Sequence, residues 1–228
     1  MILSLFDLDN TLLDGDSDYA WAQYLIEVGV LDAASYEAQN ERFYQDYQLG
    51  RLDIRAFLDF QLAPLARFPT AQLHAWRDDF LERKIRPLVL PAALALVRER
   101  VARGDRVAIV TATNAFITRP IADLFGVEHL LATEPEQING RYTGKVVGEP
   151  CFQAGKVLRL ESWLEGQGTR LAQYSSSWFF SDSRNDLPLL RVVTRPVAVR
   201  PDPALRELAE SLGWPILSLR GDDPPLPA

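Results

Sequence analysis

Apolar residues along the chain fall into two patterns: short unbroken runs typical of buried strands, and longer segments with helical spacing. The first run, Ile2 to Leu8, shows no regular alternation with polar residues and therefore predicts a strand buried on both faces, as in parallel sheets. Strands that alternate with helices imply parallel pairing through right-handed crossovers. The further strands are predicted at 106–111, near residue 130, and at 175–181, 195–200 and 214–219, with helices at 91–104, 117–125 and 152–164 and a hairpin turn at Asn139-Gly140.

Residues 16–86 interrupt this alternation. They contain no convincing strand, but their apolar residues recur at helical spacing, so the segment predicts about four helices. We therefore expect an α/β protein with a Rossmann-like doubly wound parallel sheet as its core and a helical cap domain inserted after the first strand. The core is expected to span 1–15 and 87–220 and the cap 16–86, while 221–228, rich in Asp and Pro, is expected to form a loose tail.

The composition is that of an ordinary globular protein. The 228 residues, of which 47% are hydrophobic, are enough for one sizeable core with a smaller second domain. The net charge of −7 gives no overall field that attracts a phosphate backbone, so no nucleic-acid partner is expected. No apolar run approaches the roughly 18 residues of a membrane span, so we expect no membrane partner and a cytoplasmic location. Cys151 is the single cysteine, which excludes an internal disulfide and a thiolate cluster for zinc.

Three of the predicted strands end in polar residues with complementary chemistry. They are Asp7 with Asp9, Thr111, and Asp182 with Asn185 and Asp186. Residues i and i+2 share a face of a strand, so Asp7 and Asp9 would both point toward a site beyond the strand end, where ligands gather in open α/β sheets. Two simpler interpretations stay open at this point: Asp9 opens a turn, and Asp182 caps a helix.

Lys156 is a further candidate, because lysine is rare in this chain. Only three of the 24 basic residues are lysines. Lys156 follows Gly155 near the start of a predicted helix, where a cation opposes the helix dipole. A solvated surface lysine would also account for it, and only its combination with the three strand ends favours a place in a site.

In combination, these segments resemble the haloacid dehalogenase superfamily, in the phosphoserine-phosphatase-like branch whose members carry a helical cap after the first strand. Asp7-Leu8-Asp9-Asn10-Thr11 matches the first motif of the family, and Thr111 matches the second. Lys156 supplies the third motif and Ser181 to Asp186 the fourth. The motifs come in the family's order and span nearly the whole chain, so their joint occurrence is specific although each is short.

The resemblance implies a Mg²⁺-dependent phosphomonoesterase. By resemblance, Asp7 is the nucleophile that forms an aspartyl-phosphate, and Asp9 protonates the leaving alcohol and then activates water. Thr111, Lys156 and Asn185 would hold the oxygens of the phosphoryl group.

The family also implies the ligands of the metal. They match Asp7, Asp182 and the backbone carbonyl of Asp9. Asp186 would support these ligands without coordinating the metal directly. Oxygen-rich ligands of this kind suit Mg²⁺.

The cap is expected to select the leaving group. In enzymes similar to phosphoserine phosphatase, an acid soon after the first motif holds the substrate ammonium, and a cap arginine holds its carboxylate. Asp16 matches the acid, whereas the arginine position, counted without gaps from Gly50, falls on Asp59. Asp16 and Asp59 are therefore the candidate residues for leaving-group binding, although an insertion would also place Arg51 or Arg55 there.

A cationic leaving group without a carboxylate fits the acids near the cap entrance, Asp14, Asp16 and Asp18, better than phosphoserine does. Histidinol phosphate has that character, and some phosphatases of the branch act on it. We therefore expect a small-molecule phosphate ester, histidinol phosphate, as substrate. Phosphoserine phosphatase, or a phosphomutase or phosphotransferase that uses Asp7, are the alternatives. These acids can equally be helix caps or solvated surface residues, and the oligomeric state is left open.

Overall fold

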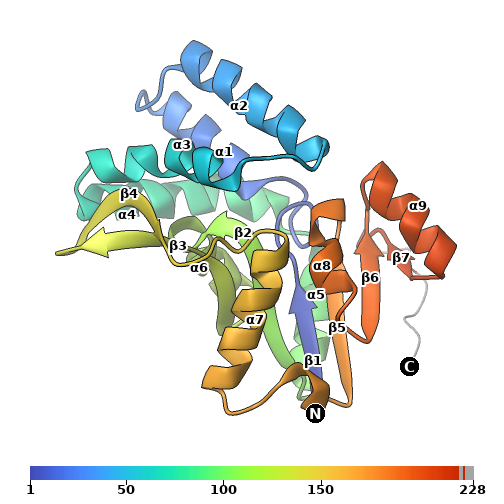
Figure 1. Cartoon of the computed structure of the whole chain (residues 1–228). Helices are drawn as coiled ribbons and strands as arrows, with labels where there is room; N and C mark the ends of the chain where they lie inside the picture. The colour runs from blue at the N-terminus through green and yellow to red at the C-terminus, as the bar shows by residue number, and fades with distance from the viewer. Residues whose placement is uncertain (221–222, 224–228) are drawn as a thin grey trace.

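The central element of the computed structural model is a seven-stranded sheet with the order β4-β3-β2-β1-β5-β6-β7 (Figure 1). The structure describes residues 1–220 and 223. The strands are β1 (Ile2–Phe6), β2 (Arg106–Asn114), β3 (His129–Ile138), β4 (Arg141–Val147), β5 (Ser176–Ser181), β6 (Arg195–Val199) and β7 (Ile216–Leu217). All neighbouring strands pair in parallel except β3 and β4, which form an antiparallel hairpin. The predicted fold class is confirmed.

Both faces of β1 are covered by apolar side chains. Leu3 and Leu5 belong to one buried cluster, and Phe6 belongs to another on the opposite face. The first cluster includes residues of α7 (Ala154–Gly166), α8 (Leu187–Leu190) and α9 (Pro203–Leu212), and the second includes residues of α5 (Pro91–Ala102) and α6 (Ala115–Leu124). Helices on both faces make the sheet doubly wound, which explains why β1 shows no alternation of polar residues.

Four helices lie between β1 and α5, where the sequence predicts a helical insert. They are α1 (Ser17–Glu27), α2 (Ala33–Gln48), α3 (Ile54–Arg67) and α4 (Thr70–Phe80), and α4 continues through a π turn (Leu81–Ile85) and a 3-10 turn (Arg86–Leu88). Asp16, Asp32 and Asp53 cap the first three helices with their carboxylates. Figure 1 shows α1, α2 and α3 above the end of the sheet toward which β1 points. The exact boundaries of the two domains stay a prediction.

Several predicted elements differ in length from those observed. β2 continues to Asn114 instead of ending at Thr111, and β3 is a strand of 10 residues rather than a short one, because its outer half pairs with β4. β7 has only 2 residues where 214–219 was predicted, and the preceding residue is Pro215, which has no N–H to donate to a ladder. The Asn139-Gly140 turn occurs as predicted, with both residues at positive φ, 51° and 76°.

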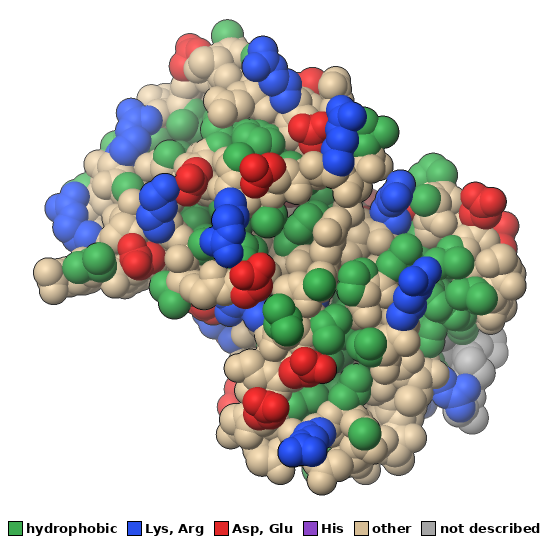
Figure 2. All heavy atoms as spheres, viewed as in Figure 1, with side chains coloured by type: hydrophobic (Ala, Val, Ile, Leu, Met, Phe, Trp, Pro, Cys, Tyr) green, Lys and Arg blue, Asp and Glu red, His purple; other side chains and the backbone are tan. Residues whose placement is uncertain are grey.

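The surface view shows no single-sign charge patch on the face drawn: basic and acidic side chains intermingle over the cap and the core (Figure 2). Within the described residues, no helix is long and apolar enough to cross a membrane. The expected loose tail at 221–228 lies outside the described residues except for Asp223, whose carboxylate accepts hydrogen bonds from the backbone N–H groups of Ser218 and Leu219.

Candidate active site

The polar strand ends meet at one edge of the sheet. β1 lies between β2 and β5, and Phe6, the last residue of β1, pairs with Ile109 on one side and Phe180 on the other. Asp7 therefore follows β1 beside the carboxyl ends of both neighbours, and its backbone N–H donates to the carbonyl of Phe180 at 2.9 Å. Parallel strands place these chain ends together, as the sequence predicts.

Lys156, from the first turn of α7, ties two of the acids together. Its ammonium donates to Asp7 Oδ1 at 2.8 Å and to Asp186 Oδ2 at 2.7 Å, and only 3% of its side chain is exposed. Burial lowers the pKa of Lys156, but the carboxylates of Asp186 and Asp7 outweigh it, so the pKa is raised and the ammonium stays charged. Burial raises the pKa of Asp186 to about 6, although Lys156 lowers it. The cation is therefore fixed beside Asp7.

Thr11 links the first and fourth motifs. Its hydroxyl lies 3.2 Å from Asp7 Oδ2 and 3.3 Å from Asp182 Oδ1, and it accepts the backbone N–H of Asp182 at 3.1 Å. A hydroxyl has one proton and can donate to only one carboxylate at a time. The sequence predicts Thr11 only as part of the motif, so its bridging role emerges from the structure.

The two carboxylates beside Thr11 fit a divalent cation. Burial raises the pKa of Asp182 well above its ordinary value, and the charges of Asp7 and Asp186 raise it further. Facing carboxylates with one shared proton donor favour a cation that offsets their repulsion. Among the described residues no three Asp, Glu, His or Cys side chains form a complete metal site. Mg²⁺ does not require three, because it keeps several waters and often takes only one or two carboxylates.

Asp9 lies on the cap side of Asp7, held by two hydrogen bonds. The backbone N–H of Ser17, the first residue of α1, donates to Asp9 Oδ1 at 2.7 Å, and the hydroxyl of Thr113 donates to Oδ2 at 2.7 Å. Burial raises the pKa of Asp9 to about 6, and the charge of Asp16 raises it as well. A carboxyl group with such a pKa is suited to give and to take a proton near neutrality. Thr113 is a site residue that sequence reasoning missed, because the strand was expected to end at Thr111.

Thr111 and Asn185, the other predicted phosphate ligands, are both buried at this edge. Thr111 Oγ1 accepts the backbone N–H of Thr113 at 3.1 Å. Asn185 Oδ1 accepts from the side-chain amide of Gln153 at 3.0 Å, and Asn185 Nδ2 donates to the carbonyl of Tyr47 at 3.4 Å. Tyr47 belongs to α2, so the cap contributes directly to the setting of Asn185.

Asp16 and Asp59, predicted to bind the leaving group, lie in different places. Asp16 caps α1 next to Ser17 and so lies beside Asp9. Asp59 is on α3 and forms an exposed ion pair with Lys145 of β4 at 2.9 Å, so the structure does not bring it to the other site residues. Asp18, in the first turn of α1, is instead buried, and its carboxylate accepts a hydrogen bond from Asn114 at 3.3 Å.

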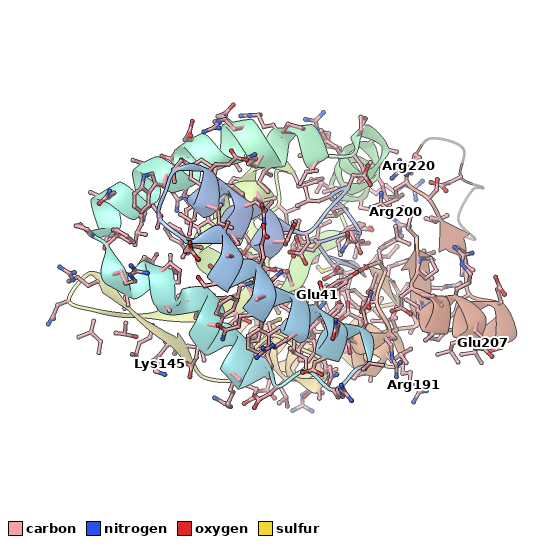
Figure 3. All side chains as sticks on the ribbon, turned by 90° about the horizontal axis from the view of Figure 1, so that it is seen from above. Glu41, Lys145, Arg191, Arg200, Glu207 and Arg220 are labelled. Atoms are coloured by element: carbon pink, nitrogen blue, oxygen red, sulfur yellow. The ribbon has the colours of Figure 1, made fainter. Side chains whose placement is uncertain are left out.

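Arg200, at the end of β6, supports the loop that follows Asp9. Its guanidinium donates to the backbone carbonyls of Asn10 and Leu13, at 2.5 and 2.8 Å, and forms an ion pair with Asp14 at 2.9 Å. Arg220 also pairs with Asp14, and Figure 3 shows the two arginines side by side at this edge of the molecule. The sequence could not predict this role of Arg200, because a single arginine after a strand belongs to no motif or repeating pattern.

The turn that presents Lys156 depends on Gly155. A Cβ atom at Gly155 would overlap the carbonyl oxygen of Pro150, and Gln153 in the same turn holds a positive φ of 48°. We expect Gly155→Ala to lower the free energy of unfolding by about 2 kcal/mol and to reduce activity, because the backbone before Lys156 must shift. Gly166, at the other end of α7, has nothing within 4 Å of an added Cβ. Gly166→Ala is the control, and in urea unfolding it is expected to be neutral or slightly stabilising; equal losses in both variants would contradict the argument.

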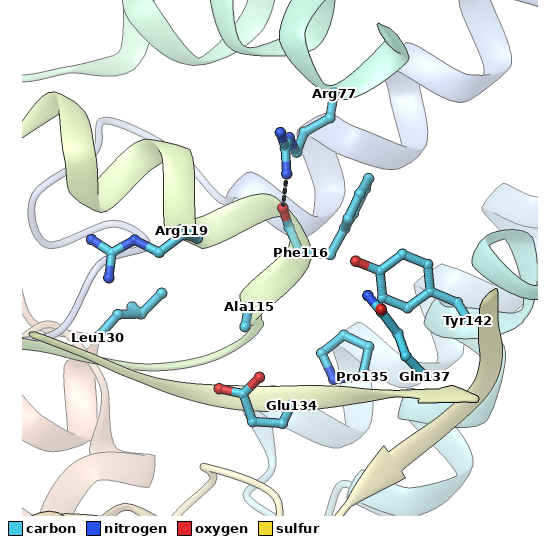
Figure 4. Close-up of a pocket in the computed structure, with 9 residues that line it drawn as sticks. All are labelled: Arg77, Ala115, Phe116, Arg119, Leu130, Glu134, Pro135, Gln137 and Tyr142. Carbon is cyan, nitrogen blue, oxygen red and sulfur yellow. Dashed lines mark hydrogen bonds between the residues drawn. The ribbon is translucent and has the colours of Figure 1, made fainter. Parts of the chain in front are cut away.

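A separate cavity of about 440 Å³ lies between α4, α6 and the β3–β4 hairpin (Figure 4). Its two arginines already have partners: Arg77 donates to Asp78 and to the carbonyl of Phe116, while Arg119 pairs with Asp123 and donates to two backbone carbonyls. None of the residues in the four motifs lines it. The acid cluster at the edge of the sheet is therefore the candidate active site.

Comparison with known proteins shows the family to which the chain belongs. A family model described as haloacid dehalogenase-like hydrolase matches residues 4–191. The chain is 48% identical to a histidinol-phosphatase of Neisseria meningitidis, over 96% of this chain and 99% of that one, and 29% identical to a phosphoserine phosphatase of Mycobacterium tuberculosis, over 95% and 70%.

Solved structures show the same fold. A protein of unknown function from Bordetella pertussis superimposes with a TM-score of 0.91 at 46% identity, covering 96% of this chain and 98% of that one. A substrate-bound phosphoserine phosphatase superimposes with a TM-score of 0.69 at 21% identity, covering 97% and 93%. The chain belongs to the haloacid dehalogenase-like hydrolase family, as one of its phosphatases.

Proposed function

We propose that this phosphomonoester hydrolase acts on histidinol phosphate. The observation that carries the proposal is the 48% identity to a histidinol-phosphatase over nearly the full length of both chains. The acids beside Asp9 give it physical support, because an imidazole ring and an ammonium group make the leaving alcohol cationic. A cytoplasmic location, expected from the sequence, is part of the same proposal.

In the proposed reaction the carboxylate of Asp7 attacks phosphorus. An O–P bond forms to Asp7, the ester O–P bond breaks, and Asp9 gives its proton to the leaving alcohol. Asp9 then takes a proton from a water molecule, whose oxygen displaces Asp7 and releases inorganic phosphate. Two supporting observations are the hydrogen bonds that hold Asp9 beside Asp7 and its pKa of about 6.

The negative oxygens of the phosphoryl group need cations and donors around them. We assign this role to Lys156, Thr111 and Asn185, which all lie buried at the same edge as Asp7. Mg²⁺ is the proposed cofactor, and when bound it would supply further positive charge against the phosphoryl oxygens. Asp7, Asp182 and the carbonyl of Asp9 would hold it, with Asp186 behind them; the facing carboxylates of Asp7 and Asp182 support this assignment.

Asp16 and Asp18 are the proposed partners of the cationic leaving group. Asp14 is neutralised by two arginines, but none of the ion pairs between described residues includes Asp16 or Asp18. Burial raises the pKa of Asp18 well above its ordinary value, and the charges of Asp16 and Asp9 raise it further. A cation arriving at these acids would relieve their mutual repulsion.

A panel of phosphate esters tests the proposal. We expect the highest kcat/KM for histidinol phosphate, above phosphoserine and p-nitrophenyl phosphate. In Asp16→Asn, which keeps a good helix cap but removes the charge, the KM for histidinol phosphate should rise about tenfold, while that for p-nitrophenyl phosphate stays within about twofold.

Asp32→Asn is the matched control, because Asp32 caps α2 on the surface in the same way. It should leave both KM values unchanged. Equal changes for the two substrates in Asp16→Asn would remove the leaving-group argument, and a preference for phosphoserine would replace the proposed substrate. A preference for phosphoserine has one supporting observation, the 29% identity to a phosphoserine phosphatase.

Release of one free phosphate in every turnover would exclude a phosphotransferase.

A further inference from the structure

Helix α2 forms the outermost part of the cap and is anchored at few points. Of its 16 residues only Tyr36 is buried. The hydroxyl of Tyr36 donates a hydrogen bond to Gln61 Oε1 of α3 at 2.7 Å. Figure 3, viewed from above, shows α2 with Glu41 crossing over the other cap helices. Near its carboxyl end, Tyr47 is half-buried and turned toward the core. The contacts of Tyr47 therefore decide how this end of the helix meets the active site.

Tyr47 makes two separate contacts with the loop that carries the fourth motif. Its hydroxyl donates to Ser183 Oγ at 2.9 Å, and its backbone carbonyl accepts from Asn185 Nδ2 at 3.4 Å. Ser183 Oγ in turn accepts the backbone N–H of Asn185 at 3.2 Å. Both contacts of Tyr47 thus converge on Asn185, one directly and one through Ser183.

The hydroxyl of Tyr47 lies next to the proposed metal ligand Asp182, because its partner Ser183 directly follows Asp182 in the chain. Burial raises the pKa of the Tyr47 hydroxyl, and the carboxylates of Asp182, Asp186 and Asp7 raise it as well. The ring lies 6.3 Å from that of Phe152, the residue before Gln153, whose amide holds the other side of Asn185. The side chain of Asn185 is therefore hydrogen-bonded both to the cap and to the turn before α7.

We propose that Tyr47 is a positioning residue for phosphate binding. Its contacts with Ser183 and Asn185 fix the Asn185 amide in the orientation that receives a phosphoryl oxygen, and they couple that orientation to the position of α2 over the site. The inference rests on the proposed role of Asn185 toward the phosphoryl group. It is independent of the identity of the leaving alcohol.

The test is the affinity of the full-length protein for inorganic phosphate, measured by calorimetry with Mg²⁺ present. Tyr47→Phe keeps the ring and loses only the hydroxyl bond, so we expect phosphate binding about fivefold weaker and a similar fall in kcat/KM for p-nitrophenyl phosphate. Tyr44→Phe is the control, because Tyr44 lies on the same helix with 53% exposure. It should change the affinity by less than about twofold.

A double variant separates positioning from a merely structural role. If Tyr47 acts through Ser183, Tyr47→Phe should cause no further loss of phosphate affinity in a Ser183→Ala background. If the double variant loses phosphate affinity by the product of the two single-variant losses, the proposal is overturned. An unchanged phosphate affinity in Tyr47→Phe would overturn it as well. Neither readout uses histidinol phosphate, so a failure of that substrate would leave the test of Tyr47 intact.

Discussion

Asp7→Asn is expected to lower kcat with every phosphate ester by about 10⁴-fold or more, while the protein still folds. An amide oxygen is too weak a nucleophile to attack phosphorus, so the first step of the proposed reaction is lost. The amide can still accept the hydrogen bond from Lys156, which in the native protein spans 2.8 Å, and so the local structure should persist. The measurement is steady-state release of phosphate, together with urea unfolding to verify the fold.

Asp123→Asn provides the control for this substitution. Asp123 is an exposed acid on α6 that pairs with Arg119. It should retain the full activity of the native enzyme. Activity near the native level in Asp7→Asn, with Asp123→Asn also active, would refute Asp7 as the nucleophile.

Lys156→Met is expected to lower the free energy of unfolding by about 3 kcal/mol and to remove measurable activity. The ammonium is the shared counter-ion of Asp7 and Asp186, at 2.8 and 2.7 Å, and all three side chains are at most 10% exposed. A methionine of similar shape would leave two buried carboxylates facing each other without a cation. Urea denaturation at neutral pH measures the loss of stability.

Lys145→Met is the matched control, because Lys145 forms its ion pair with Asp59 on the surface, where it is 63% exposed. Exposed pairs contribute little, so we expect a change below about 1 kcal/mol. Adding Asp186→Asn to Lys156→Met should restore part of the stability, since one of the uncompensated charges is removed. A Lys156→Met protein as stable as the native one would contradict the buried network.

The sequence predicted best where a pattern repeats. The unbroken apolar run of β1 and the alternation of helices and strands reflect burial on both faces of the sheet, so the fold class followed from them. The position of Asp7 and Asp9 at the end of that run predicted the edge of the sheet at which the polar strand ends meet. Positions within one element can be inferred from periodicity, because periodicity is a property of neighbouring residues.

The residues that sequence reasoning missed are single polar side chains without a repeating pattern. Thr113 was missed because the length of β2 depends on its pairing with β3, which lies outside the strand itself. Arg200 and Tyr47 contact residues that are 136 or more positions away in the sequence, through contacts that only the folded chain creates. Counting residues along the cap without gaps pointed to Asp59 as the residue at the arginine position. Sequence spacing could not predict that Asp59 forms an ion pair with Lys145, which is distant in the sequence.

The proposal that Asp7 takes up the phosphoryl group is tested most directly by trapping the phosphorylated protein. Asp9→Asn with p-nitrophenyl phosphate and Mg²⁺ is suited to this, because the leaving group needs little protonation while the attack of water on the intermediate is slowed. After an acid quench, mass spectrometry should find one phosphoryl group on the peptide that contains Asp7. Release of p-nitrophenol with this peptide unmodified, or with the phosphoryl group on another residue, would contradict the account.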